Sequence, residues 1–425
     1  MRAFHPYSGS MSEAAAMPPV AARRTVDSLD AKGKTVFVRA DFNVPTDDAG
    51  AITDDRRIRG ALPTIEALLA KGAAVVVASH FGRPAGIGYE AGESLQPVFE
   101  RLKKLLAGKA EVLFAGQVPT DAASAAAVAA LRPGQVLLLE NLRFEKGEKK
   151  GDAAFAGKLA AYGAAYVNDA FGASHRADAS MVALPRAMRA AGRPAVAGRL
   201  LERELRFLGA ALERPQRPFV AIVGGAKVSD KLAALANLLD KVDTIVVGGA
   251  MAYTFLRAMG VATGNSLVEP EMVEKARGIL HDAQARGRTI LLPVDHVCGR
   301  RLEAGTETTT VVGAIPDGWM GLDIGPRTQQ LFAEACRSAR QVVWNGPMGA
   351  FETKPFDAGT MAVTRAVAEA TRAGAVTIAG GGDTAASLDA AGLADALTHV
   401  STGGGASLEM LEGKRFESVD ALDAA

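Results

Sequence analysis

Cysteine, excess charge and long apolar runs are all scarce in this sequence, and each absence narrows the class of protein. Only two of the 425 residues are cysteines, Cys298 and Cys336, and their spacing matches no zinc or redox motif. We therefore expect reduced, partly buried thiols. The 48 basic and 47 acidic residues leave a formal net charge of +1. This balance argues against nucleic acid as a partner, because polyanion-binding surfaces carry an excess of Lys and Arg.

Signals for a membrane or for secretion are also missing. No apolar run reaches the roughly 18 residues that a membrane-spanning helix needs, so no membrane partner is expected. The first 17 residues lack the basic start and apolar centre of a secretory signal. These absences predict a cytoplasmic protein, in which residues 1–20 form a disordered extension.

What the chain does contain is a regular alternation of short apolar runs with helical stretches. Hydrophobic residues make up 48% of the chain and charged residues 22%, which is ample for a globular core. The runs are continuous rather than alternating, which indicates strands buried on both faces. The expected strands are 35–39, 75–79, 111–115, 136–140 and 165–168 in the first half, and 219–223, 244–247, 289–293, 342–344, 376–379 and 398–401 in the second. The most evident helices are expected at 61–71, 95–106, 271–286, 328–338 and 359–372.

This pattern predicts an α/β protein with two doubly wound, Rossmann-like parallel-sheet domains that face each other across a hinged cleft. A chain of this length exceeds one ordinary core. We expect an N-terminal domain at 21–198, an interdomain helix at 199–214 that ends before Pro215, and a C-terminal domain at 215–400. Residues 401–425 are expected to return towards the N-terminal domain.

In the first half, polar residues follow the expected strands, where open parallel sheets bind their ligands. Arginine offers a planar fork of donors for carboxylate or phosphate, and carboxylate or amide groups can hold hydroxyls. Singly, each arginine could be a solvated charge and each histidine a structural one. Together they indicate a small, multiply charged, hydroxylated anion. The candidates are Asp41, Asn43, Arg57, His80, Arg83, Arg143 and Arg176.

In the second half, glycines follow the strands instead. Gly224-Gly225-Ala226-Lys227 and Gly380-Gly381-Gly382-Asp383-Thr384 are each expected to open a helix, so that phosphate oxygens reach backbone amides and the helix dipole. Lys227 and Lys231 are expected on one face of the first of these helices. Asp383 could hold Mg²⁺ beside a polyphosphate, or could cap its helix. Neither a Walker A loop nor a dinucleotide fingerprint is present.

Eight segments, taken together and in order, resemble phosphoglycerate kinases from about Thr25 to the C-terminus. They are 34–45, 79–84, 140–144, 168–176, 224–231, 344–352, 380–384 and 401–405. The resemblance implies a glycolytic kinase that binds ATP or ADP as a substrate, with Mg²⁺ as cofactor. The departures are the N-terminal extension, Ser174, and Asp178, which adds a negative charge near the arginines.

By the same matching, the site residues fall into three groups. Those implied for 3-phosphoglycerate or 1,3-bisphosphoglycerate are Asp41, Asn43, Arg57, His80, Phe81, Gly82, Arg83, Arg143 and Arg176. Those implied for the nucleotide are Gly225, Ala226, Lys231, Gly249, Gly321, Asn345, Pro347, Glu352, Gly380, Gly381, Gly382, Asp383 and Thr384, with Asp383 on the metal. Those implied to face the transferring phosphoryl group are Arg57, Lys227, Gly403 and Gly404.

The acceptor in the direction that consumes ATP would be a carboxylate, which is already ionised, so no general base is required. Positioning and charge neutralisation remain as the catalytic tasks, and the cleft must close to bring both halves to one phosphoryl group. His175 is expected to be structural or to contact the substrate. A monomer is expected. The alternatives are a non-catalytic nucleotide-binding relative and a dehydrogenase, although the latter would need the missing dinucleotide fingerprint.

Overall fold

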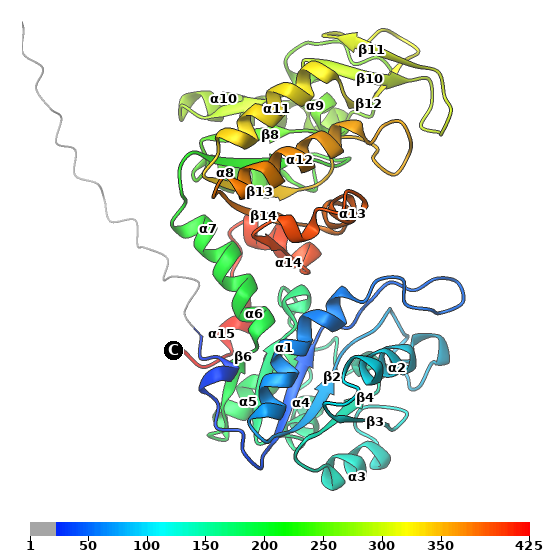
Figure 1. Ribbon diagram of the computed structural model, residues 1–425, viewed down its shortest axis with the longest axis vertical. Coiled ribbons are helices and arrows are strands. Elements are labelled where there is room, and N and C mark those ends of the chain that lie inside the picture. The colour runs from blue at the N-terminus through cyan, green and yellow to red at the C-terminus, as the bar shows by residue number, and fades with distance from the viewer. Residues whose placement is uncertain (1–22) are drawn as a thin grey trace, which may run out of the picture.

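The computed structural model describes residues 23–425, except for the side chain of Ala210, and the predicted extension at residues 1–20 lies outside this range. Figure 1 shows two lobes joined by one long helical segment. The first half of the chain forms one lobe and most of the second half forms the other. Each lobe is built on a six-stranded sheet, in which every strand pair is parallel.

The sheet of the first lobe has the strand order β3-β4-β2-β1-β5-β6. Its inner strands are rich in Val, Leu and Ala and are largely buried, as expected for a sheet covered on both faces. The five predicted strands are present, and the short β6 was missed. The strands are β1 (Thr35–Ala40), β2 (Ala74–Ala78), β3 (Glu111–Ala115), β4 (Gln135–Leu139), β5 (Ala165–Asp169) and β6 (Ala195–Ala197).

Five helices cover this sheet, and aspartates cap two of them. Asp121 accepts a hydrogen bond from Ser124 N at 2.7 Å, and Asp152 accepts one from Phe155 N at 2.7 Å, which satisfies amides that lack a partner in the first helical turn. The helices are α1 (Arg56–Ala70), α2 (Gln96–Leu105), α3 (Ala122–Ala130), α4 (Ala153–Ala160) and α5 (Leu184–Ala190). The prediction that α1 begins at Ala61 was wrong, because its first turn is polar and lines the cleft. Arg57 therefore belongs to that first turn.

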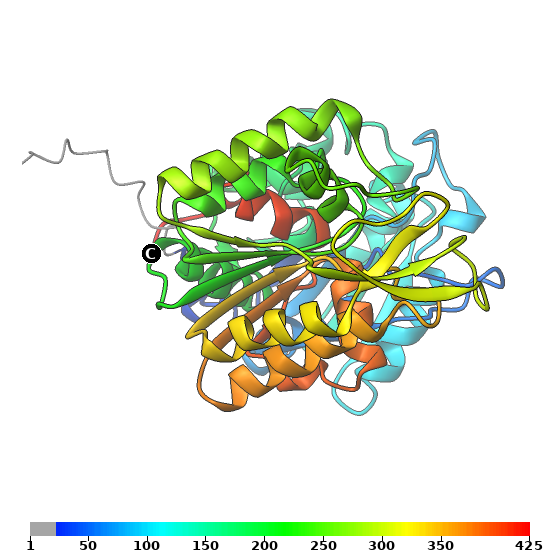
Figure 2. The same cartoon turned by 90° about the horizontal axis from the view of Figure 1, so that it is seen from above.

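The second lobe repeats the plan, with strand order β15-β14-β13-β7-β8-β9. Figure 2 shows its sheet between two groups of helices, with α10 on one side and α11 and α12 on the other. The strands are β7 (Phe219–Val223), β8 (Thr244–Val247), β9 (Thr289–Leu291), β13 (Gln341–Asn345), β14 (Val376–Gly380) and β15 (His399–Val400). The helices are α8 (Leu232–Leu239), α9 (Met251–Ala258), α10 (Val273–Ala285), α11 (Pro326–Ser338), α12 (Ala358–Arg372) and α13 (Gly382–Ala390).

A small antiparallel sheet in this lobe was not predicted. Its strand order is β11-β10-β12, formed by β10 (Asp295–Gly299), β11 (Thr308–Val312) and β12 (Met320–Ile324). The strand β11 is rich in threonine and lies at an edge, and its residues are exposed or half-buried. Such a polar segment carries little of the apolar pattern on which strand prediction depends.

One helical segment, which we call the connecting helix, joins the lobes. It is not a uniform α-helix as predicted, because α6 (Arg199–Glu204) passes through a π-helical turn (Leu205–Gly209) into α7 (Ala210–Glu213). The C-terminal helices are α14 (Gly404–Leu411) and α15 (Glu417–Asp420). Beyond them the chain reaches the first lobe, where Asp423 N donates to Ala195 O at 2.8 Å. Figure 1 shows α15 beside β6 and α5.

Both cysteines are free and buried. Between residues 23 and 425, no helix has the length and apolar character that crossing a membrane requires.

Candidate active site

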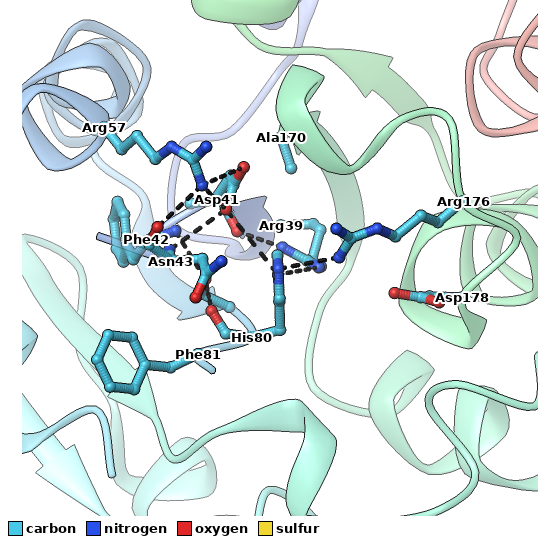
Figure 3. A network of polar contacts seen from close by, with 12 residues as sticks. Arg39, Asp41, Phe42, Asn43, Arg57, His80, Phe81, Ala170, Arg176 and Asp178 are labelled. Carbon is cyan, nitrogen blue, oxygen red and sulfur yellow. Dashed lines mark hydrogen bonds and ion pairs between the residues drawn. The ribbon is translucent and has the colours of Figure 1, made fainter. Parts of the chain in front are cut away.

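Polar side chains from three neighbouring strands meet at one edge of the first sheet. The strands β2, β1 and β5 lie side by side, and their carboxyl ends place His80, Asp41 and Arg176 close together (Figure 3). We call this group, with Arg39, Asn43, Arg57 and Arg143, the arginine site. Asp41, His80 and Arg176, predicted at strand ends, thus lie at one edge of this sheet.

Asp41 anchors one side of the arginine site. Its carboxylate lies 3.2 Å from Arg57 Nη1, which also donates to Asn43 O at 2.9 Å. Burial opposes ionisation of Asp41, but Arg57 and Arg39 nearby hold the pKa of this carboxyl below its usual value. Asp41 is therefore charged at neutral pH, and it fixes Arg57 at the edge of the cleft.

His80 lies between two arginines. Its Nδ1 is 3.1 Å from Arg39 Nη2, and its Nε2 is 3.1 Å from Arg176 Nη1. Burial lowers the pKa of His80 well below its usual value, and the surrounding arginines add to this effect, so the ring is neutral. A neutral imidazole accepts at only one nitrogen, so one of the two guanidinium groups faces an N–H. A ligand anion beside this N–H would supply the missing acceptor.

Arg39 was not among the predicted site residues, and it lies within β1 rather than after it. The side chain is fully buried, and its Nε donates to Ser180 Oγ at 2.8 Å. Ser180 Oγ in turn donates to Glu148 Oε1 at 2.6 Å, and Glu148 is also fully buried. The sequence did contain a signal for this residue, namely an arginine inside an otherwise apolar strand. A buried charge needs partners, so such an arginine indicates a polar cluster. These contacts hold Arg39 against His80.

The loop after β2 is held by two asparagines. Asn141 Oδ1 accepts from Phe81 N at 3.1 Å, and Asn43 Oδ1 accepts from Gly82 N at 2.8 Å. Arg143 Nη1 donates to Gly82 O at 2.8 Å. Arg83, by contrast, is exposed in this loop, so the structure places it at the rim of the arginine site.

The glycines of the second lobe serve close backbone packing. A Cβ at Gly224 would lie 2.1 Å from Pro347 O, and one at Gly249 would lie 2.4 Å from Gly225 O. Gly225 N and Gly249 N already donate to Pro347 O and Met348 O, at 3.2 and 2.8 Å. The glycines thus let three strand-end loops meet, and these amides are occupied. The expectation of bare amides at Gly224-Gly225 was wrong.

The two lysines after β7 do not lie on a helix, which corrects the prediction. The helix α8 begins at Leu232, so Lys227 and Lys231 belong to the turn that precedes it. Lys227 is exposed. Lys231 Nζ donates to Asn345 Oδ1, and burial lowers the pKa of Lys231. The two ammonium groups therefore occupy different environments.

Unoccupied amides are found instead at the first turns of α13 and α14. Gly381, with φ of 97°, is the N-cap of α13, and Asp383 is exposed in its first turn. Thr384 Oγ1 accepts from Gly346 N at 2.7 Å, which ties α13 to the loop after β13. At α14, the amide of Gly403 already donates to Ser401 Oγ at 3.1 Å. Ala406 N donates to Gly403 O at 2.7 Å, so the helix-start donors of α14 without a partner in the described chain are the amides of Gly404 and Gly405.

The remaining predicted nucleotide residues lie on separate loops and strands of the second lobe. Gly321 is in β12, and a Cβ there would lie 2.0 Å from Tyr253 Oη. Pro347 is buried, whereas Ala226 and Glu352 are exposed. Gly380 ends β14. The structure thus brings Asn345, Pro347 and the α13 start together, with Glu352 at a surface turn.

A cleft with a volume of about 1320 Å³ separates the arginine site of the first lobe from the starts of α13 and α14 in the second. Asn43 and Arg57 line it from the first lobe, and Gly381, Gly382 and Gly404 line it from the second. Arg56 of α1 also reaches Asp389 of α13, at 2.6 Å. Both sheets therefore present their carboxyl ends to one shared space.

A buried cluster in the middle of the connecting helix, at the end of α6, was missed. Glu204 accepts from Thr402 N at 2.9 Å, and its other oxygen lies 2.7 Å from His399 Nε2. Glu204 and His399 are both buried. No local motif marked this contact, since Glu204 and Thr402 are 198 residues apart. It joins the connecting helix to the segment that leads into α14.

Comparisons with known proteins agree with this architecture. The family model described as phosphoglycerate kinase matches residues 26–414. The chain is 51% identical over 404 residues to a phosphoglycerate kinase of Chloroflexus aggregans, a match that covers 95% of this chain and 99% of the relative. A cytosolic phosphoglycerate kinase of Triticum aestivum is 50% identical, with 96% and 100% covered.

Solved structures give the same result. The phosphoglycerate kinase from Coxiella burnetii is 39% identical with a TM-score of 0.84, and the match covers 94% of this chain and 98% of that one. The enzyme from Pyrococcus horikoshii is 30% identical with a TM-score of 0.77 and the same coverage.

The fold, the site and the relatives together place the chain in the class of two-domain α/β phosphotransferases that use a carboxyl group as acceptor. Within this class, the chain belongs to the phosphoglycerate kinase family.

Proposed function

We propose that the protein catalyses reversible, Mg²⁺-dependent phosphoryl transfer between 1,3-bisphosphoglycerate and ADP, giving 3-phosphoglycerate and ATP. The observation that carries this proposal is the shared cleft, which Arg57 lines from one lobe and the α13 and α14 starts line from the other. Arginine side chains suit a compact anion, and helix N-termini suit a phosphate chain.

In this proposal the arginine site holds the triose. Arg143 and Arg176 bind its phosphate, while Asp41 and Asn43 hold its polar groups. Because the acceptor carboxylate is already ionised, the protein supplies positioning and charge neutralisation rather than a general base. Arg57, Lys227 and the amides at the start of α14 face the transferring group. His80, which is neutral and buried, orients Arg176 and does not shuttle a proton.

Asp383 would hold Mg²⁺ together with the nucleotide phosphates. Mg²⁺ usually takes one or two carboxylates and keeps several waters. In the described residues the side chain of Asp383 makes no hydrogen bond or ion pair, and it lies in the first turn of the helix whose Gly381 and Gly382 line the cleft. This donor set fits the ion. When bound, Mg²⁺ neutralises charge on the phosphate oxygens.

Closure of the cleft would bring the arginine site and the starts of α13 and α14 to the same phosphoryl group and exclude water. The Arg56–Asp389 ion pair at 2.6 Å supports a direct approach of α1 to α13. X-ray scattering of the protein with both substrates should show a smaller radius of gyration than the free protein. An unchanged radius would argue against closure.

A coupled assay tests the proposed reaction directly, because ATP should form from ADP and 1,3-bisphosphoglycerate only when Mg²⁺ is present. A non-catalytic nucleotide-binding relative is the alternative. It predicts ADP binding by calorimetry without ATP formation.

We also propose that the protein is a cytoplasmic monomer. Residues from both lobes of the same chain line the cleft, and one of the relatives is named cytosolic. Sedimentation should give the mass of a single chain.

A further inference from the structure

A buried carboxylate lies among the arginines of the arginine site without forming a hydrogen-bonded ion pair. Asp178 is 6% exposed, and its Oδ2 is 3.9 Å from Arg143 Nη2. This oxygen is buried and has no hydrogen-bond partner among the described residues. Figure 3 shows the carboxylate beside Arg176. Buried charges normally carry such partners, so this one needs an explanation.

Helix capping does not explain it. Asp178 precedes a π-helical turn, but its side chain makes no capping hydrogen bond there, and only its carbonyl accepts from Met181 N and Val182 N. The side chain is therefore dispensable for the backbone geometry.

Asp178 has a second carboxylate near it as well as the arginines. The second nearby carboxylate, Glu148, is fully buried, and its pKa is raised by burial and also by Asp178. Arg39 lies 4.0 Å from Glu148, and Arg143 lies near both carboxylates. Arg143 uses Nη1 for Gly82 O, while its Nε is buried without a partner. Arg143 thus keeps its Nη2 for a ligand, 3.9 Å from a carboxylate that does not hydrogen-bond to it.

We propose that Asp178 is a specificity-determining residue that weakens the binding of phosphate-like dianions at Arg143 and Arg176. The negative charge repels an incoming dianion, and the repulsion is strong because the site is buried and the local dielectric constant is low. The inference rests on the proposed function for the identity of the natural ligand.

The consequence differs between ligands. A simple dianion contacts only the arginines, so the repulsion removes much of its affinity. The triose ligand also contacts residues such as Asp41 and Asn43, so it remains bound but leaves faster. Asp178 thus keeps free inorganic dianions from blocking the site.

Asp178→Asn tests this proposal, because it keeps the shape of the side chain and removes the charge. We expect sulfate, used as the probe dianion, to bind about tenfold more tightly by calorimetry, as when a like charge close to an ion is removed. The KM for 3-phosphoglycerate should fall by a smaller factor, because the triose also contacts residues outside the arginines, while the KM for ATP stays unchanged. Asp178→Ala should act in the same direction, and Asp178→Glu should retain weak sulfate binding.

Asp48→Asn is the matched control, since it removes the same formal charge from an exposed loop of the same lobe. It should leave sulfate binding unchanged. Unchanged or weaker sulfate binding in Asp178→Asn and Asp178→Ala would overturn the proposal, and weaker binding would show that Asp178 positions Arg143 favourably. A misfolded variant does not gain affinity. Because sulfate binding needs no turnover, the result decides the role of Asp178 even if the coupled assay is negative.

Discussion

The carboxylate at the end of β5 should make the stability of this protein fall as the pH rises. Asp169 is fully buried, and burial raises its pKa from 3.8 to about 7. Its Oδ1 accepts from Leu200 N and Leu201 N, at 2.9 and 3.3 Å, at the start of the connecting helix. Its Oδ2 has no hydrogen-bond partner within the described chain.

The size of the effect follows from the difference in pKa. Between pH 3.8 and about 7 the folded protein holds a proton on Asp169 that the unfolded chain has lost, so the free energy of unfolding falls as the pH rises through this window. Each pKa unit corresponds to ~1.4 kcal/mol, so ionising Asp169 in the folded state costs about 4 kcal/mol above pH 7.

Asp169→Asn removes this cost, because the amide oxygen still accepts from the helix-start amides and nothing ionises. The new NH₂ group lies where Oδ2 lacked a partner, and an unsatisfied donor costs ~1–3 kcal/mol. We expect the variant to be about 1–3 kcal/mol more stable than the parent at pH 8, and equal or less stable at pH 4.

Urea unfolding followed by circular dichroism at pH 4 and pH 8 measures both values. The decisive quantity is the change in the variant-minus-parent difference between the two pH values, because other titrating groups cancel in it. Asp48→Asn should show no such change. A difference that stays constant with pH would refute the assignment of the raised pKa to Asp169.

Three further predictions concern the cleft and the connecting helix. Lys227→Ala should lower kcat by at least ~10²-fold, as expected for loss of a transition-state contact, while calorimetry still shows nucleotide binding. The exposed control Lys275→Ala should keep near-normal turnover. The same result for Lys227→Ala would show that Lys227 does not contact the transferring group. Asp383→Ala should weaken Mg²⁺–ATP binding and leave the affinity for 3-phosphoglycerate unchanged, and equal loss of both would contradict the division of the site between the lobes. Glu204→Ala should destabilise the protein by about 3–5 kcal/mol in urea, because it leaves the buried His399 and the half-buried amide of Thr402 without their partner, and Glu204→Gln should cost less. Glu202→Gln on the same helix should have little effect, and a similar loss in that control would rule out a specific role for Glu204.

The order of elements and the polar strand ends were predictable, because both depend on short-range patterns. Continuous Val and Leu runs indicated buried parallel strands, and the residues after β1, β2 and β5 do meet at one edge. The missed elements were those with weak local signals. Strand β11 is polar and half-exposed, and the first turn of α1 is polar because it faces the cleft.

The positions of the phosphate-binding amides were less predictable. Gly224 and Gly225 looked like a phosphate loop, but tertiary packing against Pro347 uses them for close contact. A glycine is equally suited to either purpose, since both require the absence of a Cβ. Only the neighbouring loop decides which purpose applies.

The sequence by itself determined the family, the two-sheet plan and most side chains of the arginine site, with Arg39 as the exception, since motifs and strand order depend on residues that are close in the chain. The tertiary structure alone decided how those side chains are charged and held. Arg39 reaches Glu148 through Ser180, Glu204 reaches Thr402 across 198 residues, and Asp178 lies 3.9 Å from Arg143 without a hydrogen bond to its Oδ2. Burial and partners of this kind come from distant segments, and they set the pKa of His80 and Asp169 in a way that no local pattern records.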